Sequence, residues 1–171
     1  GKEGWDKIKQ LIPDLIVSDI MMPLMNGIEL SKKIKSDPRT SHIPVVLLTA
    51  MSGEEIQLEG YQAGINDYIV KPFTFEILAS RLKNLVTMQR QLRKNFQKQL
   101  EVNPGEITVT PVDEQFMKNA LAAVEKNMDN PEFTVEELSR ELFLSRVALY
   151  KKLLSLTGKT PIEFIRVLRM K

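Results

Sequence analysis

The chain has 171 residues, a formal net charge of +2 and no cysteine, with 43% hydrophobic and 27% charged residues. These values are ordinary for a soluble globular protein and exclude a disulfide framework, a thiolate zinc site and global disorder. The longest nearly apolar run, residues 43–51, is far too short to cross a bilayer. We expect one medium or two small domains in the cytoplasm, with a membrane anchor left open for upstream segments of a parent chain.

Short apolar runs alternate with helical patterns over the first 80 residues. The apolar runs are "PDLIVSD" at 13–19, "IPVVLLTA" at 43–50 and "NDYIVKP" at 66–72, and the helical patterns lie at about 27–36 and 53–63. Strands separated by helices of this length indicate a parallel α/β sheet, and strands that are apolar throughout indicate helices on both faces. The fold class predicted for this part is therefore α/β.

Each apolar run ends in a chemically different polar residue: Asp19, Thr49 and Lys71. The carboxyl ends of parallel strands meet at one edge of a sheet, so we expect these groups to converge. A carboxylate in that place can accept a phosphoryl group if an ammonium and a hydroxyl stabilise the incoming oxygens. Asp19 alone would more often be an ordinary strand-end residue, but the three groups together favour a reactive edge.

The stretches "PDLIVSDIMMPLMNG", "IPVVLLTA" and "GINDYIVKPF" resemble, in order and separation, the core motifs of response-regulator receiver domains. The resemblance covers residues 1 to about 85 and implies a flavodoxin-like fold. It implies that Asp19 is the phosphoacceptor, that Thr49 and Lys71 bind the phosphoryl group, and that Tyr68 is the aromatic switch residue. A histidine kinase or kinase domain is the implied phosphodonor, and the bond before Pro72 is commonly cis in the family.

The metal site of such receivers combines the phosphoacceptor, here Asp19, with the backbone carbonyl of Met21 and an acidic pair after the first strand. This chain opens on "GKEGWDKIKQLIPDL", which resembles the second helix of the family. We therefore expect Mg²⁺ in the intact receiver and none bound by this piece, whose sheet would lack its first strands. The strand at 15–18 would then be an exposed edge that invites self-pairing.

One long helix is predicted from residue 74 to about 101, and its part from 81 to 100 carries six basic residues and no acid. Two interpretations stay open: a dimeric coiled coil, or a short packed segment followed by a solvated helix. The seam of the coiled coil would be Leu78, Leu82, Leu85, Leu92 and Phe96. The stretch 103–111 has turn residues at both ends, so we divide the chain into a partial receiver at 1–85, a helical and extended linker at 86–111, and a last domain at 112–171.

The last domain is predicted to be all helical, with helices at 113–127, 134–142 and 145–157. Thr134 and Glu137 form a capping-box pattern, and Ser145 is a plausible cap after the tight "FLS" turn. Two short helices joined in this way indicate a helix-turn-helix, whose second helix can enter the major groove. Residues 145–171 carry seven basic side chains against one acidic, which suits phosphate contacts. A helical protein-interaction module remains the alternative.

The order "FTVEELSRELFLSRVALYKKLLSLTGKTPIEFIRVLRMK" resembles the first half of an AraC-type DNA-binding domain. The DNA-contacting residues implied are of two kinds: Arg146, Val147, Tyr150 and Lys151 facing the groove, and Lys152 and Lys159 contacting backbone phosphates. The family uses two helix-turn-helix units, and this stretch corresponds to the first.

Together these features predict a phosphorylation-responsive transcriptional regulator of a two-component system, acting as a homodimer on promoter DNA. The alternative is a receiver coupled to a helical protein-interaction output without DNA binding. A phosphohydrolase would place a second aspartate two positions after Asp19, where Met21 stands, so this piece is not expected to be an enzyme. A hybrid sensor histidine kinase stays open for the parent chain.

Overall fold

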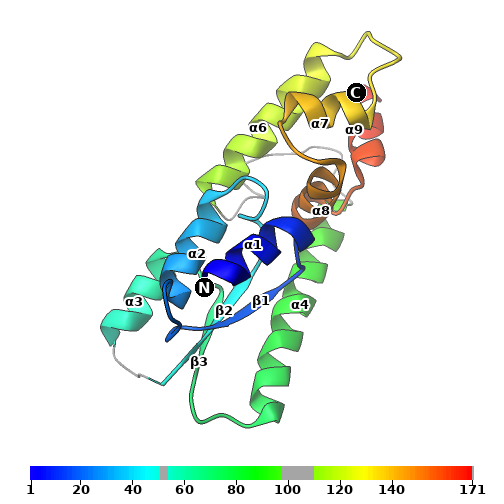
Figure 1. Cartoon of the computed structure of the whole chain (residues 1–171). Helices are drawn as coiled ribbons and strands as arrows, with labels where there is room; N and C mark the ends of the chain where they lie inside the picture. The colour runs from blue at the N-terminus through cyan, green and yellow to red at the C-terminus, as the bar shows by residue number, and fades with distance from the viewer. Residues whose placement is uncertain (51–53, 98–109, 171) are drawn as a thin grey trace. The chain divides into compact units, whose positions relative to one another are not determined.

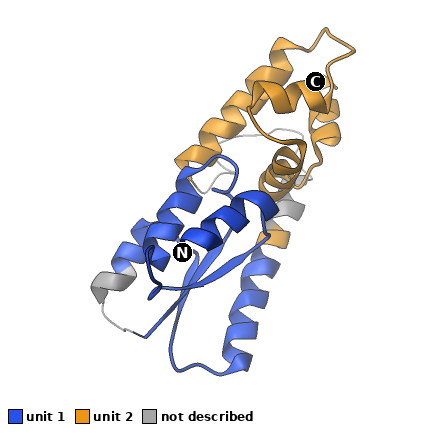
Figure 2. Cartoon of the chain, viewed as in Figure 1, with its two compact units in different colours: residues 1–88 blue, residues 89–171 orange. Residues whose placement is uncertain are grey.

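The computed structural model describes residues 1–50, 54–97 and 110–170. The chain divides into two compact units, residues 1–88 and 89–171, which are coloured separately in Figure 2. Figure 1 shows the first unit as a sheet with helices and the second as a group of helices.

The first unit contains a three-stranded parallel sheet in the order β1-β2-β3, with β2 in the middle. The strands are β1 (Ile16–Asp19), β2 (Val45–Thr49) and β3 (Asp67–Val70), and the helices are α1 (Lys2–Leu11), α2 (Gly27–Ser36), α3 (Glu54–Gln62) and α4 (Phe75–Gln97), the last of which continues past residue 88 into the second unit. In this register Asp19 stands beside Leu48, and Thr49 beside Val70. The parallel α/β sheet predicted from the alternating pattern is confirmed.

The core of this unit is centred on β2, whose Val45, Val46 and Leu47 are fully buried. The helix α2 packs against β2 and against α1, and it contributes Ile28 and Ile34 to the buried surface. A capping box starts α2: the Asn26 side chain accepts the amide of Glu29, and the Glu29 carboxylate accepts the amide of Asn26. This cap fixes where the loop after β1 ends and the helix begins.

The long helix α4 begins at Phe75, close to the predicted start. Leu78, Leu82 and Leu85 are half-buried on it. The side chains of Leu92 and Phe96 and the predicted continuation beyond residue 97 lie outside the described residues. The coiled-coil interpretation therefore stays a prediction.

The second unit has four further helices in its described part: α6 (Pro111–Lys126), α7 (Val135–Glu141), α8 (Arg146–Thr157) and α9 (Pro161–Arg169). A hydroxyl side chain caps each of them, namely Thr110, Thr134, Ser145 and Thr160. The core between them is apolar and includes Met117, Leu138, Leu149, Leu153 and Phe164, all fully buried. The helices predicted over 113–127, 134–142 and 145–157 are present with ends shifted by a few residues.

The connection from α7 to α8 is a tight turn in which Phe143 has a left-handed backbone, φ 53°, and an almost fully exposed side chain.

Among the described parts of the chain, no helix combines the length and the apolar character that a bilayer crossing requires.

Candidate phosphoacceptor site

Asp19 is the last residue of β1, and its carboxylate lies at the carboxyl edge of the sheet with about a third of the side chain exposed. One oxygen, Oδ1, accepts the Met21 amide at 3.1 Å, and the other, Oδ2, is ion-paired with the Lys71 ammonium. The carboxylate is therefore held in one orientation by a backbone donor on one side and a cation on the other, while part of it remains open to an incoming group.

The loop after Asp19 folds back closely because residue 27 is glycine. The Gly27 amide donates to the Ile20 carbonyl at 3.0 Å, and a Cβ at Gly27 would lie only 2.4 Å from the Asp19 carbonyl oxygen. A side chain in this place would push apart the end of β1 and the start of α2. Gly27 was not singled out from the sequence, although it stands in the quoted motif "MNG", where a turn glycine is a recognisable signal.

Lys71 follows β3 directly and reaches back across the sheet edge. Its amide donates to the Thr49 carbonyl at 2.6 Å, which ties the end of β3 to the end of β2, and the Lys71–Pro72 bond is cis. The hydrogen bond from the Lys71 ammonium holds the pKa of Asp19 below its usual value, while burial opposes this shift and the Met21 amide assists it. Asp19 is thus ionised at neutral pH.

Thr49 ends β2 and is buried, with 3% of its surface exposed. The structure therefore brings the carboxylate, the hydroxyl-bearing residue and the ammonium to the same edge from three neighbouring strands, as the sequence predicted. Tyr68 lies on β3, half-buried, with its ring edge-to-face against Tyr61 of α3 at 5.9 Å between centroids. Its role as a switch residue stays a prediction.

The described residues alone supply few ligands for Mg²⁺. They contain no cluster of three or more histidine, cysteine, aspartate or glutamate side chains suited to hold a metal ion. Asp19 and the Met21 carbonyl are two oxygen donors, whereas Mg²⁺ prefers six oxygens in an octahedral arrangement. These donors do not by themselves make a complete magnesium site.

A cavity of about 570 Å³ lies beside β1, bordered by that strand and by α1 and lined at one end by Asp19. In the described sheet β1 pairs only with β2, so its other backbone edge faces this cavity. Within β1 the side chain of Val17 is exposed, whereas Ile16 and Ser18 are buried.

The residues expected to contact DNA lie on and after α8, and the structure separates them into two groups. Arg146, Val147 and Tyr150 are exposed, and Lys151 is half-buried. Arg146 also approaches Glu136 of α7, with 3.6 Å between the charged atoms.

The other two residues were expected to contact phosphates, and burial corrects this expectation. Lys152 is fully buried, and its Nζ lies 2.8 Å from the carboxylate of Asp113. Lys159 is 6% exposed, and burial lowers the pKa of its ammonium. Neither side chain is accessible to a phosphate in this structure. A count of basic residues along the sequence cannot separate an inward lysine from an outward one.

Comparisons with known proteins bear on both units. The family description "Response regulator receiver domain" matches residues 1–83. The chain is 43% identical to Histidine kinase P4 of Formosa agariphila over 171 residues, which cover 100% of this chain and 12% of that protein. It is 38% identical to Chemotaxis protein CheY1 of Helicobacter pylori over 84 residues, 48% of this chain and 68% of that protein.

A third relative is DNA-binding dual master transcriptional regulator RpaA of Synechocystis, 32% identical over 111 residues, 65% of this chain and 46% of that protein. The chain thus spans a small part of the kinase and about half of RpaA. The receiver match ends near the end of the first unit, while the similarity to the kinase continues through the second. The sequence motifs, the parallel sheet and these matches agree, and the chain belongs through residues 1–83 to the response regulator receiver family.

Proposed function

We propose that this chain is the receiver and DNA-reading part of a two-component regulator, in which phosphate on Asp19 controls DNA binding by residues 112–171. Receivers take phosphate from histidine kinases. The single observation that carries the proposal is the ion pair of Asp19 and Lys71 at the open edge of the sheet. In this ion pair the ionised carboxylate of Asp19, the proposed nucleophile, contacts the Lys71 ammonium, whose positive charge would stabilise the phosphorylated form.

In the proposed phosphoryl transfer, one bond forms and one bond breaks. An oxygen of the ionised Asp19 forms a bond to phosphorus, while the bond from phosphorus to the donor histidine nitrogen breaks and that nitrogen keeps the electron pair. Lys71 then pairs with a phosphoryl oxygen instead of the free carboxylate, and Thr49 donates its hydroxyl to another. Mg²⁺ is proposed as the cofactor of this site, where Asp19 and the Met21 carbonyl would be two of its oxygen ligands. Similarity to Histidine kinase P4 along all 171 residues supports a hybrid kinase as the parent.

DNA reading is assigned to α7 and α8, as a helix-turn-helix of the AraC type. Three observations support it: the tight turn between the helices, the exposed Arg146, Val147 and Tyr150 on α8, and the similarity to the DNA-binding RpaA. In this assignment Lys151 also faces the groove, whereas Lys152 and Lys159 are left out because they are buried.

Homodimerisation is assigned to the surface formed by α3, β3 and α4. Leu58 and Tyr61 of α3 are exposed there, at 60% and 52%, and Tyr61 contacts Tyr68. Arg81 of α4 forms an ion pair with Asp67 of β3 at 3.0 Å on the same surface. Exposed apolar side chains beside a charged pair are typical of a protein interface. A movement of Tyr68 on phosphorylation would alter this surface directly.

The test is a salt series of DNA-binding titrations on the full natural chain, with and without beryllofluoride and Mg²⁺ to mimic aspartyl phosphate. We expect the mimic to make DNA binding tighter and sequence-selective. Each of the variants Asp19→Ala and Tyr150→Ala should lose this behaviour, for a different reason. Asp19→Ala should lose the response to the mimic, and Tyr150→Ala should lose selectivity. Binding that ignores both the mimic and the DNA sequence would contradict the proposal.

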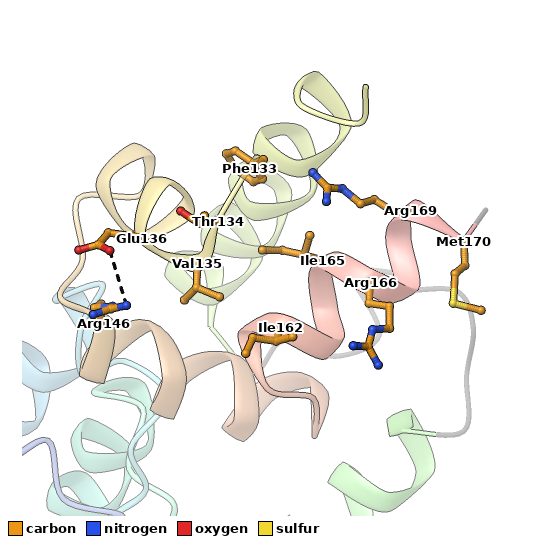
Figure 3. A pocket seen from close by; sticks show the side chains of 10 residues that line it. All are labelled: Phe133, Thr134, Val135, Glu136, Arg146, Ile162, Ile165, Arg166, Arg169 and Met170. Atoms are coloured by element: carbon orange, nitrogen blue, oxygen red, sulfur yellow. Dashed lines mark ion pairs between the residues drawn. The ribbon is translucent and has the colours of Figure 1, made fainter. Parts of the chain in front are cut away.

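A protein-interaction output is the second candidate, because the second unit has an apolar pocket of about 580 Å³. Figure 3 shows Phe133 and Val135 on one side of it and Ile162 and Ile165 of α9 on the other, with Arg166 nearby. This candidate predicts no salt-dependent affinity for DNA, so the same titration separates the two.

A further inference from the structure

The most unusual contact in the second unit joins two buried charges. Lys152 of α8 and Asp113 of α6 have side chains that are 0% and 1% exposed, with 2.8 Å between Nζ and Oδ1. The Lys152 ammonium also lies 4.7 Å from the centre of the Phe116 ring, one turn along α6. The second carboxylate oxygen of Asp113 accepts the hydroxyl of Thr110 at 2.8 Å. The charge pair is thus enclosed in a connected polar network.

Stability alone does not require this pair. A buried ion pair loses much of its attraction to the cost of removing both charges from water, and apolar side chains of similar size are often equally stabilising in the same place. The neighbouring inward residues of α8, namely Ala148, Leu149, Leu153 and Leu156, are apolar. An ion pair is directional, because its charged atoms come into contact at only one rotation and axial position of one helix relative to the other.

The pair acts on the face of α8 opposite to the proposed DNA contacts. At 3.6 residues per turn, Val147 and Tyr150 point about 140° and 160° away from Lys152 around the helix axis. A slip of one residue would rotate α8 by about 100° and shift it by about 1.5 Å along its axis. Such a slip would carry Arg146, Val147 and Tyr150 away from the groove. A much smaller rotation of α8 would already break the 2.8 Å contact of the ion pair, whereas the non-directional apolar contacts of the core tolerate small rotations.

We propose that Asp113 and Lys152 are positioning residues that set the rotation and axial place of α8, and through them the sequence selectivity of DNA binding. This proposal rests on the proposed DNA-reading function. It assigns a role to Lys152 that is opposite to the one expected from the sequence: the side chain acts from inside the domain on the residues that touch DNA.

The experiment uses the full natural chain and two DNA probes. One duplex is selected by the wild-type protein from a random library, and the other is a scrambled duplex of the same composition. The double variant Asp113→Asn/Lys152→Met removes both charges, keeps an acceptor for Thr110 and keeps the side-chain volume of Lys152. The selectivity, measured as the ratio of the two affinities at fixed salt, is expected to fall about tenfold or more, with little change in Tm and in scrambled-duplex affinity.

Two further variants show what the loss means. Asp113→Asn/Lys152→Gln also removes both charges but allows a directional hydrogen bond, and it is expected to keep most of the selectivity. The matched control is Glu114→Gln/Lys118→Met, which removes an exposed ion pair of α6, 2.7 Å between charged atoms, and should change neither Tm nor selectivity.

Several results would overturn the proposal. Selectivity unchanged in the Met variant would show that the pair does not position α8. A collapse of Tm in that variant would show that the pair serves stability itself. A wild-type protein that selects no sequence from the library would instead contradict the DNA-reading function, and the positioning role would fall with it.

Discussion

Asp19 and Lys71 stand 52 residues apart in the chain and form an ion pair at the carboxyl edge of the sheet. The pair joins β1 to the residue after β3 across the intervening β2, whose last residue, Thr49, accepts the Lys71 amide. One cation therefore fixes the orientation of the carboxylate and sets its proton affinity.

Lys71→Met is expected to raise the pKa of Asp19 toward its ordinary value, because the hydrogen bond from Lys71 is the largest cause of the lowering. In the wild type, a lowered pKa means that ionised Asp19 stabilises the fold above its ordinary pKa, and this contribution disappears as pH falls through the lowered value. The Lys71→Met variant should lose this pH-dependent contribution to the stability of the fold. The measurement is an NMR pH titration of the Asp19 carboxyl carbon. The control Lys33→Met, an exposed lysine of α2, should leave the titration unchanged; an unchanged titration in Lys71→Met would refute the prediction.

Gly27→Ala is expected to destabilise the first unit by about 1–3 kcal/mol, the usual cost of forcing atoms into a filled space. The new Cβ would lie 2.4 Å from the Asp19 carbonyl oxygen, so the backbone at Asp19 must move. Urea unfolding measures the loss of stability, and the rate of labelling by a small phosphodonor in the full natural chain measures the effect on the site.

The matched control is Gly4→Ala. A Cβ at Gly4 meets nothing within 4 Å, and the residue lies within α1. Alanine should therefore stabilise the unit by about 0.5–1 kcal/mol. Equal effects of the two substitutions would mean that the close approach at Gly27 has no energetic importance.

Phe143→Gly is expected to stabilise the second unit by about 0.5–1 kcal/mol. Phe143 has φ 53°, a conformation that costs a residue with a Cβ about 1–2 kcal/mol, and part of the gain is offset because glycine is more flexible when unfolded. Its side chain is 94% exposed, so little packing is lost. Thermal unfolding gives the change in Tm. Phe143→Ala keeps the strained Cβ and serves as the control; an equal gain in that variant would assign the effect to the ring rather than to the backbone.

Thr134→Ala is expected to cost about 1 kcal/mol, because it removes the capping box that starts α7. The Thr134 hydroxyl accepts the Glu137 amide at 3.3 Å, and the Glu137 carboxylate accepts the Thr134 amide at 2.7 Å. A helix of seven residues depends strongly on its cap. Denaturant unfolding is the measurement, and Thr134→Ser, which keeps the hydroxyl, should stay close to the wild type. A similar loss in both variants would point to the methyl group instead.

The convergence of Asp19, Thr49 and Lys71 at one edge of the sheet is predictable from the sequence because the signals that define it are local. Three apolar runs, each ending in Asp19, Thr49 or Lys71, predict parallel strands, and parallel strands bring their carboxyl ends together without further information. The caps at Thr134 and Ser145 were likewise readable from short-range patterns. The importance of Gly27 depends on how closely the start of α2 approaches the end of β1. The sequence motif alone does not indicate this distance.

The parallel sheet, the receiver motifs and the helical second unit are readable from the sequence, since each depends on periodicity and on residues near one another. Which charged side chains face water depends instead on how the helices pack against one another. Lys151 and Lys152 are neighbours in the sequence, yet the first is half-buried and the second is fully buried against Asp113. A helix turns by about 100° per residue, so adjacent lysines face different surroundings. The partner that accepts a buried charge comes from another helix, and packing alone identifies it.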